Sequence, residues 1–431
     1  KLFCRIPGIV LVDVISTPSS VHTFARRDCF GTRMMMRDRR CPMMMMMMAV
    51  NGRTSFVRPF HLLLTSLNLV FMMSILVPSS SAFCLHGGRL AARSSTVLWQ
   101  TAAAQGKNYS DMTIADTPLG TTKGSKLLDG LDVYCVPSSD DRHPLAVYGI
   151  QSSDPKETDN VLLMLHGRTW SSVPVYHLLG GPINAQKGLE SHSLMEALLA
   201  RNIQVYAMDF RGFGGTPKDA TRGVEPNRCV EDVEAVLTWL QERHGPQTGL
   251  SLLGWSQGAL VAQLAAQRRK PLFSKLILYG SIYDPLVRYP REPLYVKNKV
   301  PIADIENTYD AAVEDFTIEG TIPPEPAREF AKAALLSDPI KAPWKQLHQF
   351  NNLDPGRVHI PTLVVSGDQD PYCPLHVQQE LFTNLARGSD KTWSILANAD
   401  HAVHLLEGRS RFANVVTSFL QNSKMRDDRS H

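Results

Sequence analysis

Short continuous runs of apolar residues recur along the chain from about residue 111 onward. Uninterrupted runs of this length are typical of strands that are buried on both faces of a sheet. They predict core strands at 161–165, 203–208, 250–253, 276–279, 362–365 and 393–396. Two further runs, at 133–136 and 145–150, flank a turn-rich segment and predict a hairpin that precedes the core.

Segments with apolar residues at helical spacing separate these runs. They predict helices at 191–200, 230–240, 259–269 and 326–336. Because strands and helices alternate, we expect an α/β fold with a mostly parallel central sheet flanked by helices. Its core is expected to comprise residues 109–282 and 359–425.

One long segment interrupts this alternation. Between Tyr279 and Thr362 the sequence is rich in proline and short helical pieces, and no strand is expected there. We therefore predict that residues 283–358 form a helical cap inserted between late core strands. An inserted cap of this kind shapes the entry of substrate. The alternative is a set of ordinary surface helices.

The first 108 residues are expected to be a targeting presequence. Arg53 and Arg58 precede an apolar stretch at 60–77, and small residues follow up to Phe83, in the order of a signal peptide. Residues 83–108 contain no Asp or Glu, which is typical of a transit peptide. The arrangement resembles the bipartite presequences of secondary plastids, which implies a plastid location. Secretion into the endomembrane system and a membrane anchor are the alternatives.

Composition and charge narrow the range of partners. Of 431 residues, 43% are hydrophobic and 20% are charged, as in an ordinary globular protein. Residues 1–60 carry ten Lys and Arg against three Asp, so this segment holds +7 and the remainder −3 of the net +4. No basic stripe in the body indicates nucleic-acid binding. The seven cysteines lack metal-ligand spacing and no dinucleotide fingerprint occurs, so neither a metal nor a cofactor is expected.

The strongest chemical signal is the sequence Gly254-Trp255-Ser256-Gln257-Gly258, which lies between a predicted strand and a predicted helix. A serine at such a sharp turn is presented above the sheet as a nucleophile, and small residues must stand two positions before and after it. Both positions are glycine here, so we predict that Ser256 is the nucleophile.

A serine hydroxyl needs a base, and the base needs an acid that orients it. Asp368 and Asp370 follow the strand predicted at 362–365, and His401 and His404 follow the one at 393–396. Acid and base therefore occur in the order that an α/β sheet with a serine nucleophile requires. Both lie at carboxyl ends of strands, where sites in open α/β sheets are found.

Residues 161–420 resemble the α/β-hydrolase superfamily, in its serine esterase and lipase-like branch. The matching motifs are Leu165-His166-Gly167, Asp209–Gly214, Gly254–Gly258, Gly367–Asp370 and His401–Glu407. The resemblance implies that Asp370 is the acid, with Asp368 as competitor, and that His401 is the base, with His404 as a packing residue. Asp400 departs from the family pattern, which usually has glycine there.

The resemblance also implies an oxyanion hole formed by the backbone amides of Gln257 and Arg168. The side chain of Arg168 is expected to point to solvent, or to read a polar or anionic group of the substrate. Trp255 and Trp170 are expected to line the substrate pocket or to belong to the core. Asp209 is expected to organise its loop.

We therefore expect a hydrolase that cleaves a carboxylic ester, or a related acyl bond, of a small molecule. A cap would be the place for any contact with lipid or a membrane surface. Acyl transfer and carbon–carbon bond hydrolysis on the same fold are alternative activities. A ligand-binding protein without catalysis is a further alternative, although it would have no use for a complete set of serine, histidine and aspartate.

Overall fold

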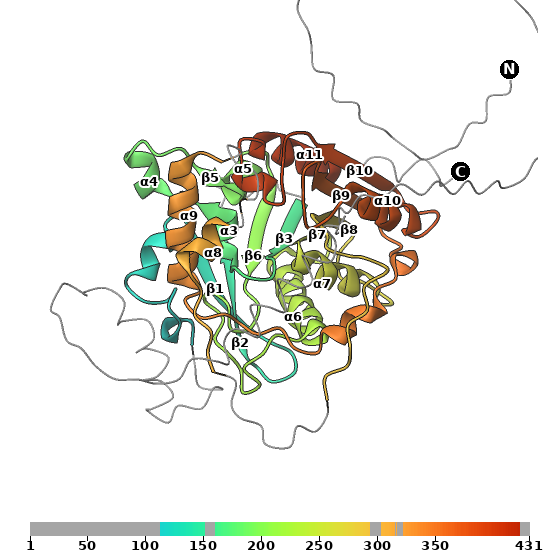
Figure 1. Cartoon of the computed structure of the whole chain (residues 1–431), viewed down its shortest axis with the longest axis horizontal. Helices are drawn as coiled ribbons and strands as arrows, with labels where there is room; N and C mark the ends of the chain where they lie inside the picture. Colours follow the sequence, from blue (N-terminus) through green and yellow to red (C-terminus); the bar gives the residue numbers. More distant parts are fainter. Residues whose placement is uncertain (1–112, 151–159, 294–302, 315, 317–321, 423–431) are drawn as a thin grey trace, which may run out of the picture. The chain divides into compact units, whose positions relative to one another are not determined.

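The apolar runs form an eight-stranded sheet in the computed structural model, which describes residues 113–150, 160–293, 303–314, 316 and 322–422 (Figure 1). Its strands in chain order are β1 (Asp132–Pro137), β2 (Pro144–Gly149), β3 (Asn160–Leu165), β6 (Gln204–Met208), β7 (Gly249–Trp255), β8 (Lys275–Tyr279), β9 (Thr362–Gly367) and β10 (Lys391–Leu396). They lie side by side in the order β1-β2-β6-β3-β7-β8-β9-β10. β1 pairs antiparallel with β2, and β2 with β6, while all other neighbours are parallel. The predicted fold class and hairpin are confirmed.

Two hydrophobic clusters, one on each face of the sheet, explain the continuous apolar runs. In β3, Leu162 and Met164 belong to one cluster and Leu163 and Leu165 to the other, as the two-residue period of a strand requires. All four side chains are fully buried. A polar residue at any of these positions would face apolar neighbours, and this is why the run has no polar interruption.

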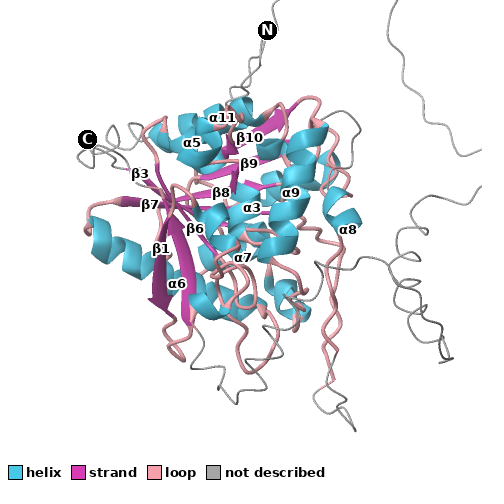
Figure 2. Cartoon of the chain, turned by 90° about the vertical axis from the view of Figure 1, so that its left-hand side faces the viewer, coloured by secondary structure: helices cyan, strands magenta, loops and turns pink. Residues whose placement is uncertain are grey.

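Helices supply the opposing surface of each cluster, so that both faces of the sheet are covered (Figure 2). One face packs against α6 (Pro226–His244), α7 (Gln257–Ala266) and α10 (Leu375–Asn384). The other packs against α3 (Ser172–Tyr176), α5 (Leu194–Leu199), α9 (Pro324–Ser337) and α11 (Arg409–Gln421). The helices predicted at 230–240, 259–269 and 326–336 are confirmed as α6, α7 and α9.

The helix predicted at 191–200 begins later than expected. His192–Ser193 forms the short strand β5, which pairs with β4 (His177–Leu178), and α5 starts at Leu194. The Ser193 side chain accepts a hydrogen bond from the Glu196 amide at 3.1 Å and so caps the helix. The remaining short elements are α4 (Pro182–Gln186), α8 (Tyr309–Val313), η2 (Ile114–Asp116), η3 (Gly124–Leu128), η4 (Leu347–Asn352), η5 (Pro355–Arg357) and η6 (Val403–Leu405).

The segment between β8 and β9 is helical where the structure describes it. It contains α8, α9, η4 and η5, and its extended contacts in the described residues are two isolated bridges. α9 covers the sheet face that carries α3, and the Phe330 ring meets the Trp170 ring edge-on at 6.3 Å. The boundaries of the predicted cap at 283 and 358, and its role in substrate entry, stay predictions.

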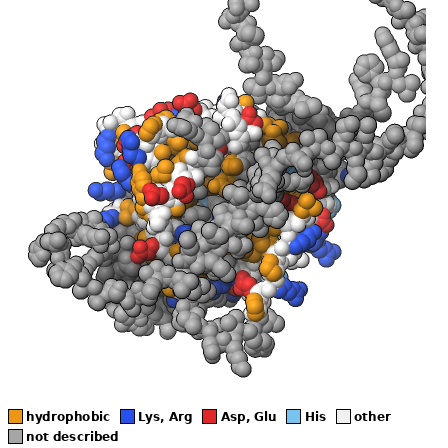
Figure 3. Space-filling model, viewed as in Figure 1, with side chains coloured by type: hydrophobic (Ala, Val, Ile, Leu, Met, Phe, Trp, Pro, Cys, Tyr) orange, Lys and Arg blue, Asp and Glu red, His pale blue; other side chains and the backbone are white. Residues whose placement is uncertain are grey.

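On the face drawn in Figure 3, apolar side chains of the described residues lie among acidic and basic ones. The segment between β8 and β9 contributes Leu286, Val287, Ile305 and Tyr309 to the exposed large apolar residues. In the described part of the chain, no helix has both the length and the apolar character to cross a membrane. The predicted presequence, residues 1–108, lies outside the described residues.

Candidate active site

The parallel strands bring the predicted site residues to one edge of the sheet. Arg168 follows β3, Ser256 follows β7, Asp370 follows β9 and His401 follows β10. These strands run in the same direction within the order β3-β7-β8-β9-β10, so their carboxyl ends meet at one edge. Residues up to 233 positions apart in the sequence, Arg168 and His401, are therefore gathered by the sheet alone.

Ser256 occupies a strained turn between β7 and α7. Its φ of 57° and ψ of −121° are rarely adopted by a residue with a side chain, and such strain is typical of a nucleophile elbow. A Cβ atom on Gly254 would lie 2.3 Å from the Gly258 carbonyl oxygen, and one on Gly258 would lie 2.3 Å from the His166 carbonyl oxygen. The two glycines are thus required by close backbone contacts, as the sequence predicted.

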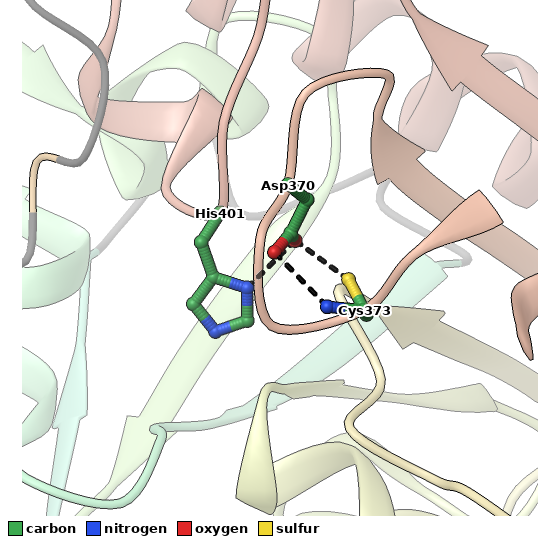
Figure 4. Close-up of side chains that lie close together, drawn as sticks. All are labelled: Asp370, Cys373 and His401. Atoms are coloured by element: carbon green, nitrogen blue, oxygen red, sulfur yellow. Dashed lines mark hydrogen bonds and ion pairs between the residues drawn. The ribbon is translucent and has the colours of Figure 1, made fainter. Parts of the chain in front are cut away.

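His401 and Asp370 form a hydrogen-bonded pair (Figure 4). His401 Nδ1 lies 2.7 Å from Asp370 Oδ2, and the two residues are only 7% and 6% exposed. Burial alone would raise the pKa of Asp370, but hydrogen bonds and the charge of His401, together with the Cys373 thiol and the Tyr372 amide, hold this pKa below its ordinary value of 3.8. The carboxylate is therefore ionised at neutral pH and accepts the Nδ1 proton, which leaves Nε2 as the basic nitrogen.

The competing residues have other partners. Asp368 is exposed, and its Oδ1 accepts a hydrogen bond from the Ala399 amide at 3.2 Å. His404 is fully buried, and its Nδ1 pairs with the Tyr279 hydroxyl at 2.9 Å. Burial lowers the pKa of His404 to about 3, so that this imidazole stays neutral. Of the two acids and two histidines, the structure pairs Asp370 with His401.

Trp255 connects the serine turn to the histidine loop. Its indole nitrogen donates a hydrogen bond to the His401 carbonyl oxygen at 2.9 Å, and the two rings lie 5.2 Å apart. Gly280, which follows β8 with a φ of +50°, leaves room for the ring, because a Cβ there would lie only 3.2 Å from the imidazole. The sequence predicted a substrate contact or a core position for Trp255. Its 6% exposure and this hydrogen bond make it part of the scaffold, and a substrate contact stays a prediction.

The predicted oxyanion donors flank the serine. Gln257 is the first residue of α7, and the loop after β3 approaches so closely that a Cβ on Gly167 would lie 3.2 Å from the Ser256 Cβ. Arg168 is exposed, and its carbonyl accepts a hydrogen bond from the Trp344 indole at 3.0 Å. The donor role of the Gln257 and Arg168 amides stays a prediction. Trp170 is 2% exposed and packs in the core against Phe330.

Two residues around the imidazole carry no sequence motif. Tyr372 is 47% exposed, and its ring meets the His401 ring edge-on at 5.0 Å. The Cys373 thiol donates a hydrogen bond to Asp370 Oδ2 at 2.6 Å. Only their position directly after the acid in the chain could have indicated them.

Asp370, Cys373 and His401 are also the described residues whose ligand atoms lie close enough together, within 4.8 Å, to hold a metal ion. Their closeness is accounted for by the hydrogen bonds that join them, since Asp370 Oδ2 accepts from both partners. The donor set is therefore satisfied as a hydrogen-bonded group.

A second group of buried acids lies between the loops after β3 and β6. Asp209 accepts hydrogen bonds from the Tyr148 hydroxyl, the Ser172 amide and the Gly215 amide at 2.6–2.9 Å. Asp338, directly after α9, accepts from the Ser171 amide and hydroxyl and from the Gly214 amide at 2.7–2.8 Å. Asp209 thus holds its loop together, as expected, while Asp338 was not expected from the sequence.

A mostly parallel sheet with helices on both faces, carrying a serine elbow and a histidine–aspartate pair at one edge, is the arrangement of an α/β-hydrolase. The family model described as "Serine aminopeptidase, S33" matches residues 185–408, slightly more than half of the chain. The protein belongs to this family.

Individual relatives are more distant. Polyketide synthase ThaQ of Burkholderia thailandensis is 31% identical over an alignment of 211 residues that covers 44% of this chain and 10% of the synthase. The chain thus spans about a tenth of the length of this curated relative.

Similar solved structures include three hydrolases. A serine hydrolase involved in carbazole degradation is 17% identical, with a TM-score of 0.46 over 67% of this chain and 98% of that chain. An esterase from Exiguobacterium antarcticum is 19% identical, with a TM-score of 0.42 over 66% and 98%. A membrane phospholipase A described as a bacterial virulence factor is 18% identical, with a TM-score of 0.48 over 84% and 98%.

Proposed function

We propose that the protein is a serine hydrolase that cleaves a carboxylic ester, or a related acyl bond, through an acyl-enzyme on Ser256. One observation carries the proposal: a strained serine turn and a buried, hydrogen-bonded histidine–aspartate pair stand at the same sheet edge, joined by the contact from Trp255 to His401. This combination supplies a nucleophile, a base and the residue that orients the base.

In the proposed reaction, Ser256 Oγ attacks the carbonyl carbon of the substrate while His401 Nε2 takes the hydroxyl proton. The resulting oxyanion is held by the backbone amides of Gln257 and Arg168. Collapse of the tetrahedral intermediate breaks the bond to the leaving alcohol, which receives its proton from His401. Water, deprotonated by His401, then attacks the acyl group and releases the acid from Ser256.

Asp370 makes this proton transfer favourable. Its lowered pKa keeps the carboxylate charged, so that it stabilises the imidazolium formed when His401 takes the proton. Trp255 holds the His401 carbonyl oxygen, and the rings of Trp255 and Tyr372 contact the imidazole, which reduces the loss of freedom on reaching the transition state.

Arg168 favours an ester over an amino-terminal peptide. An aminopeptidase binds the protonated amine of its substrate, whereas the exposed guanidinium of Arg168 stands in the loop that contacts Ser256. A protonated amine that approached this guanidinium would be repelled by it. A neutral or anionic acyl substrate suits this position better. We also propose that the acyl chain of the substrate is lipid-like. The exposed apolar residues between β8 and β9 support this.

The test is labelling of the purified chain with a fluorophosphonate probe, followed by mass spectrometry. We expect the label on Ser256, no label in Ser256→Ala, and much slower labelling in His401→Ala. Hydrolysis of p-nitrophenyl butyrate is then compared with that of an aminoacyl p-nitroanilide. Absence of label on the folded protein would contradict the serine mechanism, and faster cleavage of the anilide would contradict the ester assignment.

The plastid location is a separate proposal that rests on the sequence of residues 1–108. A fusion of these residues to a fluorescent protein, expressed in a cell with secondary plastids, tests it. Fluorescence in the endomembrane system, with none in the plastid, would favour secretion.

A further inference from the structure

The acid of the candidate triad has a second side-chain partner. Cys373 Sγ lies 2.6 Å from Asp370 Oδ2, the same oxygen that accepts the hydrogen bond from His401 Nδ1 (Figure 4). The cysteine is 1% exposed and the aspartate 6%. The contact is thus made inside the protein, where a polar group without a partner would be costly.

The thiol is the donor in this contact. Burial, and then the negative charge and hydrogen bond of Asp370, raise the pKa of Cys373 well above its ordinary value. The sulfur therefore keeps its proton at neutral pH, and the ionised carboxylate can only accept. A protonated, buried thiol is also a poor nucleophile and a poor target for oxidants. The geometry points to a structural use of the S–H bond.

The four donors around Asp370 account for its full acceptor capacity. Oδ1 accepts from the amides of Tyr372 at 2.9 Å and Cys373 at 3.2 Å. Oδ2 accepts from the Cys373 thiol and from His401 Nδ1. A carboxylate offers about four lone-pair positions. The carboxylate plane is therefore held from both ends, and the thiol fixes the oxygen that faces the imidazole.

We propose that Cys373 is a positioning residue, whose thiol holds Asp370 Oδ2 in line with His401 Nδ1 and weakens that oxygen as an acceptor. The proposal rests on the proposed function, since it assigns Asp370 and His401 their triad roles. Without the thiol, the carboxylate shares its charge among fewer donors. It then binds the imidazolium more strongly, which raises the pKa of His401.

Other titratable groups face the imidazole and stay unchanged in the test. They are Asp370 and Tyr372 from the loop after β9 and His404 from the loop of His401 itself, while Tyr279 from β8 contacts His404 behind them. A shift in the titration of His401 can therefore be assigned to the altered cysteine.

The test compares Cys373→Ala and Cys373→Ser with Cys229→Ala in the full chain. Cys229 is a matched control, because it is also a buried thiol but lies on α6, in the hydrophobic cluster that this helix forms with the sheet. Its loss creates a cavity there without altering a contact of Asp370 or His401. Two readouts are followed: the low-field proton resonance of His401 Nδ1 with pH, and the pH profile of kcat/KM on an ester.

We expect Cys373→Ala to raise the pKa of His401 and of the acidic limb of the profile by about half a unit to one unit. Cys373→Ser keeps a donor and should return both values towards the wild type, and Cys229→Ala should leave both unchanged. If the alanine variant does not fold, Cys373→Val replaces it as a variant without a donor.

An unchanged titration of His401 in the variants without a donor would overturn the proposal and leave the thiol as a space-filling group. The resonance does not depend on turnover. If Ser256 takes no label and no ester is cleaved, the proposed function fails, while the His401 titration still decides the role of Cys373.

Discussion

Buried aspartates in two regions of this molecule have pKa values that are shifted in opposite directions. Asp370 lies next to His401 and has a pKa below its ordinary value. Asp209 and Asp338 are buried, and burial raises their pKa values to about 6 and about 7. All three carboxylates accept at least three hydrogen bonds, so the number of donors does not explain the difference.

Burial raises the pKa of all three carboxylates, but at Asp370 the contacts with His401 and the other donors outweigh burial, whereas at Asp209 and Asp338 they do not. Asp370 faces an imidazole that can become a cation, and a positive neighbour favours the charged carboxylate. Asp338 receives neutral amides and a hydroxyl, and the charge of Asp209 raises its pKa further. The first carboxylate is therefore suited to proton transfer. The second group is suited to joining the end of α9 to the loops after β3 and β6 (Figure 1).

The largest expected effect lies at Asp370. Asp370→Asn keeps the shape of the side chain but removes the charge and favours the wrong tautomer of His401, so kcat on an ester should fall by about 10⁴-fold. Steady-state kinetics and thermal unfolding are measured together. Asp368→Asn is the matched control and should stay within about threefold, because that side chain is exposed and binds the Ala399 amide. Equal losses in both variants would contradict the pairing of Asp370 with His401.

Asp338 should matter for stability rather than for proton transfer. Asp338→Ala leaves the Ser171 amide and hydroxyl and the Gly214 amide without their acceptor, and should lower the free energy of unfolding by about 3 kcal/mol. Urea denaturation measures this loss. Asp310→Ala, at an exposed acid on α8, serves as control and should cost less than about 0.5 kcal/mol. An Asp338→Ala protein as stable as the wild type would contradict the role of Asp338 in stabilising the fold.

The two groups should also differ in their dependence on pH. The pKa of Asp338 is raised on folding, so its contribution is fully present below about pH 4 and is lost as the pH rises through about 7. The contribution of Asp370 is present above its ordinary pKa of 3.8 and is lost as the pH falls below that value.

The measurement is the free energy of unfolding of the wild type minus that of Asp338→Asn, which cancels opposing contributions such as that of His404. Between pH 4 and 7 this difference should fall, by on the order of 3 kcal/mol. A difference that is constant with pH would show that Asp338 has the same pKa in the folded and unfolded chain.

The smallest effect is expected at the exposed charge beside the site. Arg168→Ala keeps the backbone amide, so kcat/KM on a neutral ester should stay within about twofold. An ester with a carboxylate on its acyl chain should lose about two- to fivefold, as for an exposed ion pair. Equal kinetics of the variant and the wild type on both esters would show that Arg168 does not read the substrate.

The sequence by itself determined the order of elements and most of the chemistry. The predicted strands of the sheet, the hairpin and the serine turn follow from local periodicity and from glycine spacing, which are properties of neighbouring residues. It missed β4, β5 and α3, because elements of two to five residues are too short to display a period.

Only the tertiary structure decided which acid meets which histidine. Asp368 and Asp370 are two positions apart, and the path of the loop after β9 turns one outward and the other towards His401. The same holds for Trp255, which reaches the His401 carbonyl across 146 positions, and for Asp338, which meets Ser171 across 167. The physical reason is that a hydrogen bond depends on atoms within about 3 Å in space, and local patterns along the chain carry no information on which distant loop supplies the partner.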